Sequence, residues 1–167
     1  MKSINITTED NYRLSAHLFE PEHSNGKLLL INSATGVKQQ IYFSFAQFFS
    51  EKGFTVITYD YRGIGQSKPD KMKGFEASMR IWGTKDYKAV TDYINANFQD
   101  YQKLCLGHSV GALILGMNED FKIFDEFIFV GTQNAFVGNL KFKTKIEAYL
   151  GFGIVQPLST KILGYFP

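Results

Sequence analysis

The residues best suited to covalent chemistry lie in the pentapeptide GHSVG at positions 107–111. This pentapeptide directly follows the apolar run 104–106, which reads as a buried strand, and it opens a segment with helical character. A serine at the apex of such a tight turn exposes its hydroxyl, and glycines two positions before and after it avoid a collision with the neighbouring backbone. The spacing therefore predicts that Ser109 is a nucleophile and that Gly107 and Gly111 shape the turn. The N–H of Val110 is expected to stabilise a developing oxyanion.

A structural alternative is a glycine-rich turn whose serine only caps the following helix. It accounts for one of the two glycines, but not for their equal spacing on either side of Ser109. The spacing therefore favours nucleophilic catalysis over capping.

The surrounding sequence predicts strands and helices in alternation. An alternating apolar pattern on both sides of the turn-forming segment 8–11 indicates an antiparallel hairpin. Continuous apolar runs indicate strands buried on both faces, and apolar residues at helical spacing indicate helices between them. The expected strands are 28–31, 54–59, 104–106 and 127–130, and the expected helices are 41–53, 78–98 and 110–117. This order is typical of a mostly parallel sheet with helices on both faces.

Two further motifs accompany the pentapeptide: residues 60–67 read DYRGIGQS, and the loop 32–37 reads NSATGV. With GHSVG, these motifs resemble the α/β-hydrolase superfamily, and most of all a bacterial branch of predicted hydrolases related to serine aminopeptidases and lysophospholipases. The resemblance extends from the first hairpin to the last residue. The glycines of 60–67 are expected to shape a turn that Asp60 and Arg62 pin with ionic hydrogen bonds.

The resemblance implies a second oxyanion donor in the loop after the third strand. Asn32 and Ser33 stand where many members of the superfamily carry a His-Gly motif. By position, the backbone N–H of Ala34 is the expected donor, and Thr35 is the next candidate.

The resemblance also implies a triad that runs serine, acid, histidine along the chain. The histidines are His17, His23 and His108, and none follows Ser109. His108 adjoins the serine, but a residue beside the apex of the turn normally directs its side chain away from it. Residues 131–134, after the last expected strand, contain no carboxylate. The triad acid and base are therefore expected beyond this chain, with the fold truncated after about six strands.

The C-terminal segment 139–167 is rich in apolar and aromatic residues. Similar enzymes insert a helical cap at this point. We therefore expect residues 1–138 to form the N-terminal part of the core and residues 139–167 to begin a cap that shapes an apolar substrate pocket. A plain amphipathic packing helix and association with a membrane surface are the alternatives.

The last expected strand, 127–130, contains neither charge nor proline. Both features normally discourage a strand at the edge of a sheet from pairing with another chain. The sequence therefore predicts self-association, or pairing with a second chain, through this exposed edge.

The composition is that of a globular protein. Lys and Arg number 18 against 16 Asp and Glu, without a basic block, so nucleic acid is not an expected partner. The N-terminus has no continuous apolar stretch, no run reaches the length of a membrane span, and Cys105 is the single cysteine, which together favour a cytoplasmic protein. Metal ligands with suitable spacing are absent, and Lys68 stands where a dinucleotide fingerprint needs its third glycine, so neither metal nor cofactor is expected.

Together these features predict a serine hydrolase that cleaves an ester, thioester or amide through an acyl-enzyme on Ser109. The expected substrate is a small molecule with an acyl group and an apolar part. The alternatives are an acyltransferase with the same nucleophile, and a non-catalytic fragment or interaction module that keeps half of the fold. The isolated 167-residue chain is expected to be inactive, because its serine lacks a base.

Overall fold

The computed structural model describes residues 1–132 and 137–163. The chain clusters into two compact units, one made of Met1–Lys68 and Ala77–Thr132, the other of Pro69–Glu76 and Gln133–Pro167. The first unit carries the sheet and the residues that the sequence singles out for chemistry. The second unit carries the C-terminal helices.

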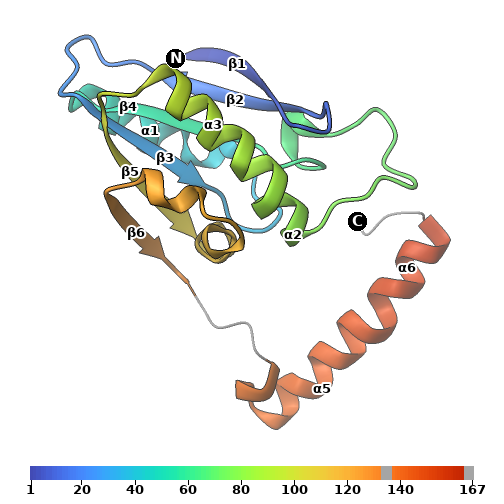
Figure 1. The fold of residues 1–167 in the computed structure, drawn as a ribbon. Coiled ribbons are helices and arrows are strands. Elements are labelled where there is room, and N and C mark those ends of the chain that lie inside the picture. Colours follow the sequence, from blue (N-terminus) through green and yellow to red (C-terminus); the bar gives the residue numbers. More distant parts are fainter. Residues whose placement is uncertain (133–136, 164–167) are drawn as a thin grey trace. The chain divides into compact units, whose positions relative to one another are not determined.

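A six-stranded sheet forms the centre of the first unit, with the strand order β1-β2-β4-β3-β5-β6 (Figure 1). The strands are β1 (Lys2–Thr7), β2 (Arg13–Phe19), β3 (Lys27–Asn32), β4 (Thr55–Tyr59), β5 (Gln102–His108) and β6 (Glu126–Val130). β1 and β2 form the expected hairpin, and β2 pairs antiparallel with β4. The pairs β4–β3, β3–β5 and β5–β6 are parallel. The prediction of a mostly parallel sheet with an antiparallel N-terminal hairpin is confirmed.

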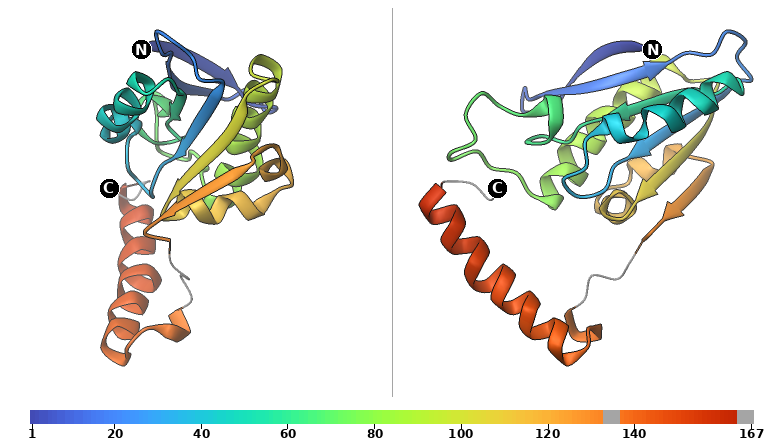
Figure 2. Two further views of the ribbon diagram at one scale, coloured as in Figure 1. Left: turned by 90° about the vertical axis from the view of Figure 1, so that its left-hand side faces the viewer. Right: turned by 180° about the vertical axis from the view of Figure 1, so that it is seen from behind.

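Helices cover both faces of this sheet (Figure 2). α1 (Phe43–Glu51) follows the 3₁₀ turn η1 (Gln39–Tyr42) and packs on one face. α3 (Tyr87–Asn97) and the short α4 (Val110–Leu113) pack on the other. The remaining short elements of this unit are η2 (Gly65–Ser67), α2 (Met79–Ile81), η3 (Trp82–Asp86), η4 (Ile114–Met117) and η5 (Asp120–Ile123).

Two clusters of buried side chains hold the layers together. In β3, Leu28 and Leu30 belong to the cluster under α3, whereas Leu29 and Ile31 belong to the cluster under α1. Successive side chains of a strand point to opposite faces, so a strand covered on both sides must be apolar at every position. This explains why β3 appears in the sequence as a continuous apolar run and not as an alternating pattern.

The segment 78–98 differs from the single helix that its apolar spacing predicts. A π-helical turn, η3, separates α2 from α3. At Gly83 an added Cβ would lie only 2.6 Å from the sulfur of Met117, and Trp82 Nε1 donates to the Arg62 carbonyl over 3.1 Å. The π-helical turn thus lies where η3 packs against η4 and against the turn after β4.

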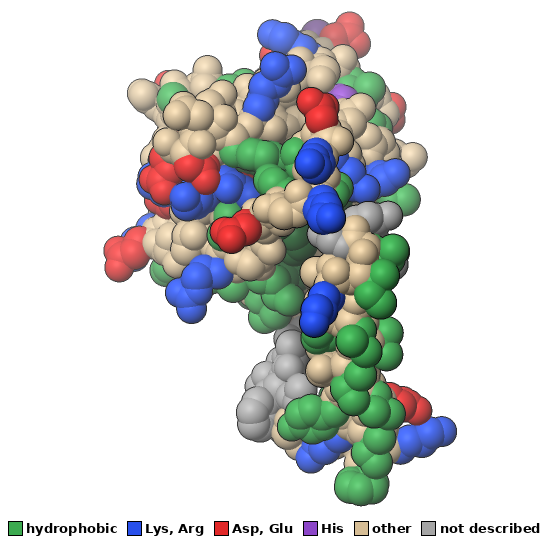
Figure 3. Space-filling model, turned by 90° about the vertical axis from the view of Figure 1, so that its right-hand side faces the viewer, with side chains coloured by type: hydrophobic (Ala, Val, Ile, Leu, Met, Phe, Trp, Pro, Cys, Tyr) green, Lys and Arg blue, Asp and Glu red, His purple; other side chains and the backbone are tan. Residues whose placement is uncertain are grey.

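The second unit contains a 3₁₀ turn at Val137–Asn139, followed by α5 (Phe142–Leu150), a π-helical turn at Gly151–Val155 and α6 (Gln156–Leu163). Large apolar side chains are exposed along these helices, as Figure 3 shows, including Phe142 at 79% and Phe152 at 74%. The role of residues 139–167 as the start of a cap stays a prediction. No helix in the described part of the chain is both long and apolar enough to span a membrane.

Strand β6 forms one edge of the sheet, and each of Phe127, Ile128, Phe129 and Val130 is more than a third exposed. An apolar edge of this kind offers unpaired backbone groups to another strand. We predict that the 167-residue chain self-associates through β6, which sedimentation velocity measures as a concentration-dependent increase in mass. Ile128→Lys should suppress this association, whereas Ile41→Lys, at a 73% exposed site on η1, should not. A wild-type chain that stays monomeric at high concentration would contradict the prediction.

Candidate active site

Ser109 lies in the turn between β5 and α4, with φ 53° and ψ −115°. Only two described residues other than glycine have a positive φ, and the other is Asn11. Serine rarely adopts this region, and strained residues of this type concentrate at functional sites. Although Ser109 occupies the N-cap position of α4, its side chain makes no capping hydrogen bond. The capping alternative therefore does not explain this serine.

The two glycines beside Ser109 have no room for a side chain. A Cβ at Gly107 would lie 2.6 Å from Ala112 Cα, and a Cβ at Gly111 would lie 2.2 Å from the carbonyl oxygen of Asn32. Both contacts are with backbone atoms, which cannot rotate away. The turn is therefore tight enough to bring α4 directly against the end of β3.

The loop after β3 lies beside the Ser109 turn because the two strands are parallel neighbours. Asn32 pairs with Gly107 in the sheet register, so Ala34 and Ser109 each lie two residues beyond a paired position. The Tyr59 hydroxyl donates to Asn32 Oδ1 over 2.8 Å and fixes the residue that leads into the loop. Ala34 is buried in this loop, whereas Thr35 is exposed.

The N–H of Ala34 already has a partner in this structure. It donates to the hydroxyl oxygen of Tyr42 over 3.0 Å. The same hydroxyl lies 2.9 Å from His108 Nδ1, with the two rings edge to face. Ala34, Tyr42 and His108 thus meet at one oxygen atom, which sequence spacing did not predict.

The other histidines lie in structural positions. His17 on β2 is buried, packs against Phe43 with ring centroids 4.7 Å apart, and shares a 3.0 Å hydrogen bond from Nδ1 with Gln39. His23 is exposed in the link between β2 and β3. Among the described residues, no side chain forms a hydrogen bond with the Ser109 hydroxyl, so none is placed there as a general base.

The sequence was compared with protein families and with curated proteins. Residues 24–119 match the model of the family described as serine aminopeptidase, S33, which is more than half of the chain. The chain belongs to this family. The search of curated proteins gave no match.

Solved structures of α/β-hydrolases share the fold of this family member. A thermostable carboxyl esterase from Bacillus coagulans has 17% identity and a TM-score of 0.73, and the match covers 99% of this chain and 55% of the esterase. The α/β-hydrolase GrgF from Penicillium sp. has 20% identity and a TM-score of 0.71, and the match covers 99% of this chain and 56% of GrgF. XC6422 from Xanthomonas campestris, a serine hydrolase without a lid, has 15% identity and a TM-score of 0.65, and the match covers 84% of this chain and 64% of XC6422. The chain therefore spans less than two thirds of the length of these proteins.

In this member of the serine aminopeptidase S33 family, the turn after β4 is held by two separate sets of hydrogen bonds. Asp60 is fully buried and accepts from the backbone N–H groups of Gln39 and Gln66, over 2.8 and 2.9 Å. An added Cβ at Gly65 would lie 2.3 Å from the Asp60 carboxylate, so only glycine fits under it. Asp60 thereby ties the turn to η1, the element that carries Tyr42.

Arg62 forms the second set, with partners that the sequence did not identify. Its Nε donates to Asp86 over 2.7 Å, and its Nη1 donates to Asp10 over 2.8 Å. Burial raises the pKa of Asp86 to about 6, and the hydrogen bonds from Arg62 hold the pKa of Asp10 well below its usual range. The arginine thus joins the hairpin, the turn and η3 in one ionic cluster.

This cluster makes stability depend on pH in a defined direction. The carboxyl of Asp86 has a higher pKa in the folded chain than in the unfolded chain, so the folded state binds its proton more tightly. The free energy of unfolding should therefore fall by roughly 1–3 kcal/mol as the pH rises from about 4.5 to 7. Asp10 stays ionised in both states over this range. Urea unfolding should show this slope in the wild type and lose it in Asp86→Asn; a wild type that gains stability relative to Asp86→Asn with rising pH would contradict it.

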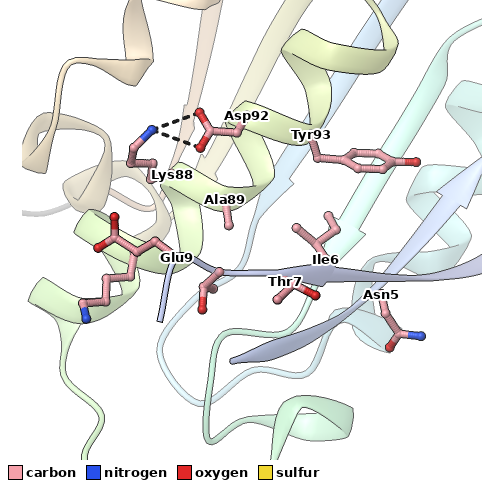
Figure 4. Close-up of a pocket in the computed structure, with 10 residues that line it drawn as sticks. Asn5, Ile6, Thr7, Glu9, Lys88, Ala89, Asp92 and Tyr93 are labelled. Atoms are coloured by element: carbon pink, nitrogen blue, oxygen red, sulfur yellow. Dashed lines mark hydrogen bonds and ion pairs between the residues drawn. The ribbon is translucent and has the colours of Figure 1, made fainter. Parts of the chain in front are cut away.

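Three further features can be set apart from the site. A groove of about 420 Å³ between β1 and α3 is lined by residues that include Lys88 and Asp92, but not by Ser109 (Figure 4). In residues 1–132 and 137–163, no group of three or more His, Cys, Asp or Glu side chains is arranged to hold a metal ion. Cys105 is fully buried, and burial raises the pKa of its thiol far above the usual value, so it is not a second nucleophile.

Proposed function

We propose that Ser109 is the nucleophile of a serine hydrolase that cleaves an ester, thioester or amide. The observation that carries this proposal is the backbone of Ser109, which has a positive φ, no capping hydrogen bond and a partly exposed position between two glycines that admit no side chain. A strain of this kind is retained where it presents a reactive group. The family match supports the same chemistry.

The proposed reaction proceeds in two steps. The Ser109 oxygen attacks the acyl carbon while a general base takes its proton, and the resulting oxyanion collapses as the leaving group departs with that proton. Water then attacks the acyl carbon of the acyl-enzyme and gives a proton to the base. The bond to Ser109 breaks, the carboxylic acid product leaves, and the base returns the proton to the Ser109 oxygen. An acceptor alcohol or amine in place of water would give an acyltransferase with the same first step.

The oxyanion would be stabilised from two elements. Val110 is the first residue of α4, so its N–H has no acceptor within that helix and would donate to a negative oxygen. The loop after β3 would supply the second donor, and Ala34 is the residue that the resemblance assigns. Ala34 follows β3 at the edge of the sheet where Ser109 follows β5, and its N–H is bound to Tyr42.

The triad acid and base would come from outside residues 1–167. No histidine follows Ser109 in the sequence, and the three solved hydrolases named above are all considerably longer than the matched region. A non-catalytic role for the isolated chain is the second candidate, because its described residues offer no base to Ser109.

A serine-directed fluorophosphonate tests the nucleophile. In a protein that carries this chain together with its acid and histidine, we expect one label, on Ser109, and none in Ser109→Ala. The 167-residue chain alone should label much more slowly, because a serine hydroxyl without its general base is a weak nucleophile. Labelling at another serine, or equal labelling of Ser109→Ala, would contradict the assignment.

A further inference from the structure

The hydroxyl of Tyr42 lies directly on the expected oxyanion donor. It accepts the hydrogen of the Ala34 N–H over 3.0 Å and lies 2.9 Å from His108 Nδ1. A backbone N–H has a single hydrogen, so Ala34 cannot also donate fully to a substrate oxygen while it holds this hydroxyl. Either Tyr42 leaves when substrate binds, or its hydroxyl takes over the role of the N–H.

Three elements hold Tyr42 in this position. It is the last residue of η1, whose first residue, Gln39, is fully buried and is hydrogen-bonded to both oxygens of the Asp60 carboxylate. Its hydroxyl is bound by the loop after β3 and by the residue that precedes Ser109. Tyr42 is therefore held both at its backbone and at its hydroxyl, which makes it a preorganised group.

The position of the hydroxyl relates it to the reacting serine. His108, which it contacts, is adjacent to Ser109 in the chain, and Ala34 lies at the same level of the sheet as Ser109 because Asn32 pairs with Gly107. Gly111 packs against the Asn32 carbonyl, so the first turn of α4 and the loop after β3 lie against each other. The Tyr42 hydroxyl is thus bound to two segments, the loop after β3 and the end of β5, that lead directly to the Ser109 turn.

We propose that Tyr42 supplies the second oxyanion donor through its O–H, and that Ala34 and His108 position it. This inference rests on the proposed function of Ser109. The proposal assigns His108 the tautomer with its hydrogen on Nδ1, so that the phenol oxygen accepts from this nitrogen as well as from the Ala34 N–H. The O–H of Tyr42 then keeps its own hydrogen for a third partner. Accepting two hydrogen bonds also polarises that O–H and makes it a stronger donor.

The surroundings of Tyr42 favour this role. Burial raises the pKa of its phenol, so the hydroxyl keeps its proton at neutral pH and remains a donor. A donor whose oxygen is already held in place needs little reorganisation when negative charge develops on the substrate. Tyr42→Phe removes only this hydroxyl and leaves the ring in place.

The test compares steady-state turnover of a chromogenic acyl ester by the full-length protein and its Tyr42→Phe variant. We expect kcat to fall by about 10²-fold with little change in KM, because an oxyanion donor acts mainly in the transition state. Tyr93→Phe is the matched control, since Tyr93 is a partly exposed tyrosine on α3 that lies outside the site. An unchanged or increased kcat in Tyr42→Phe would overturn the proposal, because it would show that the hydroxyl is dispensable or obstructs the site.

His108 provides a second test, and its single variants also test the proposal if Tyr42→Phe does not fold. His108→Leu should lower kcat, and His108→Asn, which places an amide N–H near the position of Nδ1, should restore much of it. In the Tyr42→Phe background, His108→Leu should have no further effect, since a positioning residue acts only through the group it positions. Equal losses in both backgrounds would overturn the role given to His108. Full turnover by Ser109→Ala would instead overturn the proposed function itself.

Discussion

Replacing Ser109 by alanine should reduce turnover of an activated ester by at least about 10⁴-fold in the full-length protein. The reason is chemical: without the serine oxygen no acyl-enzyme forms, and only the oxyanion donors and substrate binding remain. The backbone strain at Ser109 does not depend on the hydroxyl, so the fold should be unaffected. Initial rates, with circular dichroism of both proteins, measure the two effects separately.

A second serine serves as the control for this experiment. Ser78 is exposed and caps α2 by accepting the Ile81 N–H over 3.2 Å, so it has an ordinary structural role. Ser78→Ala should keep wild-type turnover and cost at most a small amount of stability. Turnover by Ser109→Ala at the level of Ser78→Ala would show that Ser109 is not the nucleophile.

Substituting alanine for Gly111 should destabilise the folded chain by about 1–3 kcal/mol. The new methyl group would lie 2.2 Å from the Asn32 carbonyl oxygen and 2.7 Å from the Asn32 carbonyl carbon, both in the central strand β3. Relief would require α4 to move away from the sheet, which would also displace the N–H of Val110. Urea unfolding should therefore show a lower midpoint, and activity should fall with it.

Gly116 offers a matched control in the next turn of the same segment. Nothing lies within 4 Å of a Cβ built at Gly116, so Gly116→Ala should be neutral or slightly stabilising. Equal midpoints for Gly111→Ala and the wild type would mean that the contact between α4 and β3 is looser than the structure shows.

The sequence could predict the features that depend on local pattern. Alternation identified the hairpin of β1 and β2, and a continuous apolar run identified β3, because period and burial are encoded in neighbouring residues. The spacing of GHSVG likewise singled out the one described serine with a positive φ. The assignment of Ser109 as a nucleophile remains a prediction, as do the roles of Val110 and Ala34.

The features that the sequence could not predict depend on distant residues. Tyr42 and His108 are 66 positions apart, and Arg62 and Asp86 are 24 apart, so no local pattern relates them. The π-helical turn at η3 also escaped prediction, because the residues it contacts, Met117 and Arg62, come from distant parts of the chain. The sequence gives little indication of the role of Gln39, a polar residue next to an apolar helix, because only the fold shows that its side chain is buried.

The acyl-enzyme on Ser109 is the central claim, and trapping it is the most direct test. The full-length protein is mixed with a slowly hydrolysed acyl ester, quenched in acid during the burst phase, digested and mapped by mass spectrometry. We expect the mass of one acyl group on the peptide that contains Ser109, in an amount that matches the burst. An acyl group on any other residue, or turnover without an acylated peptide, would contradict this account.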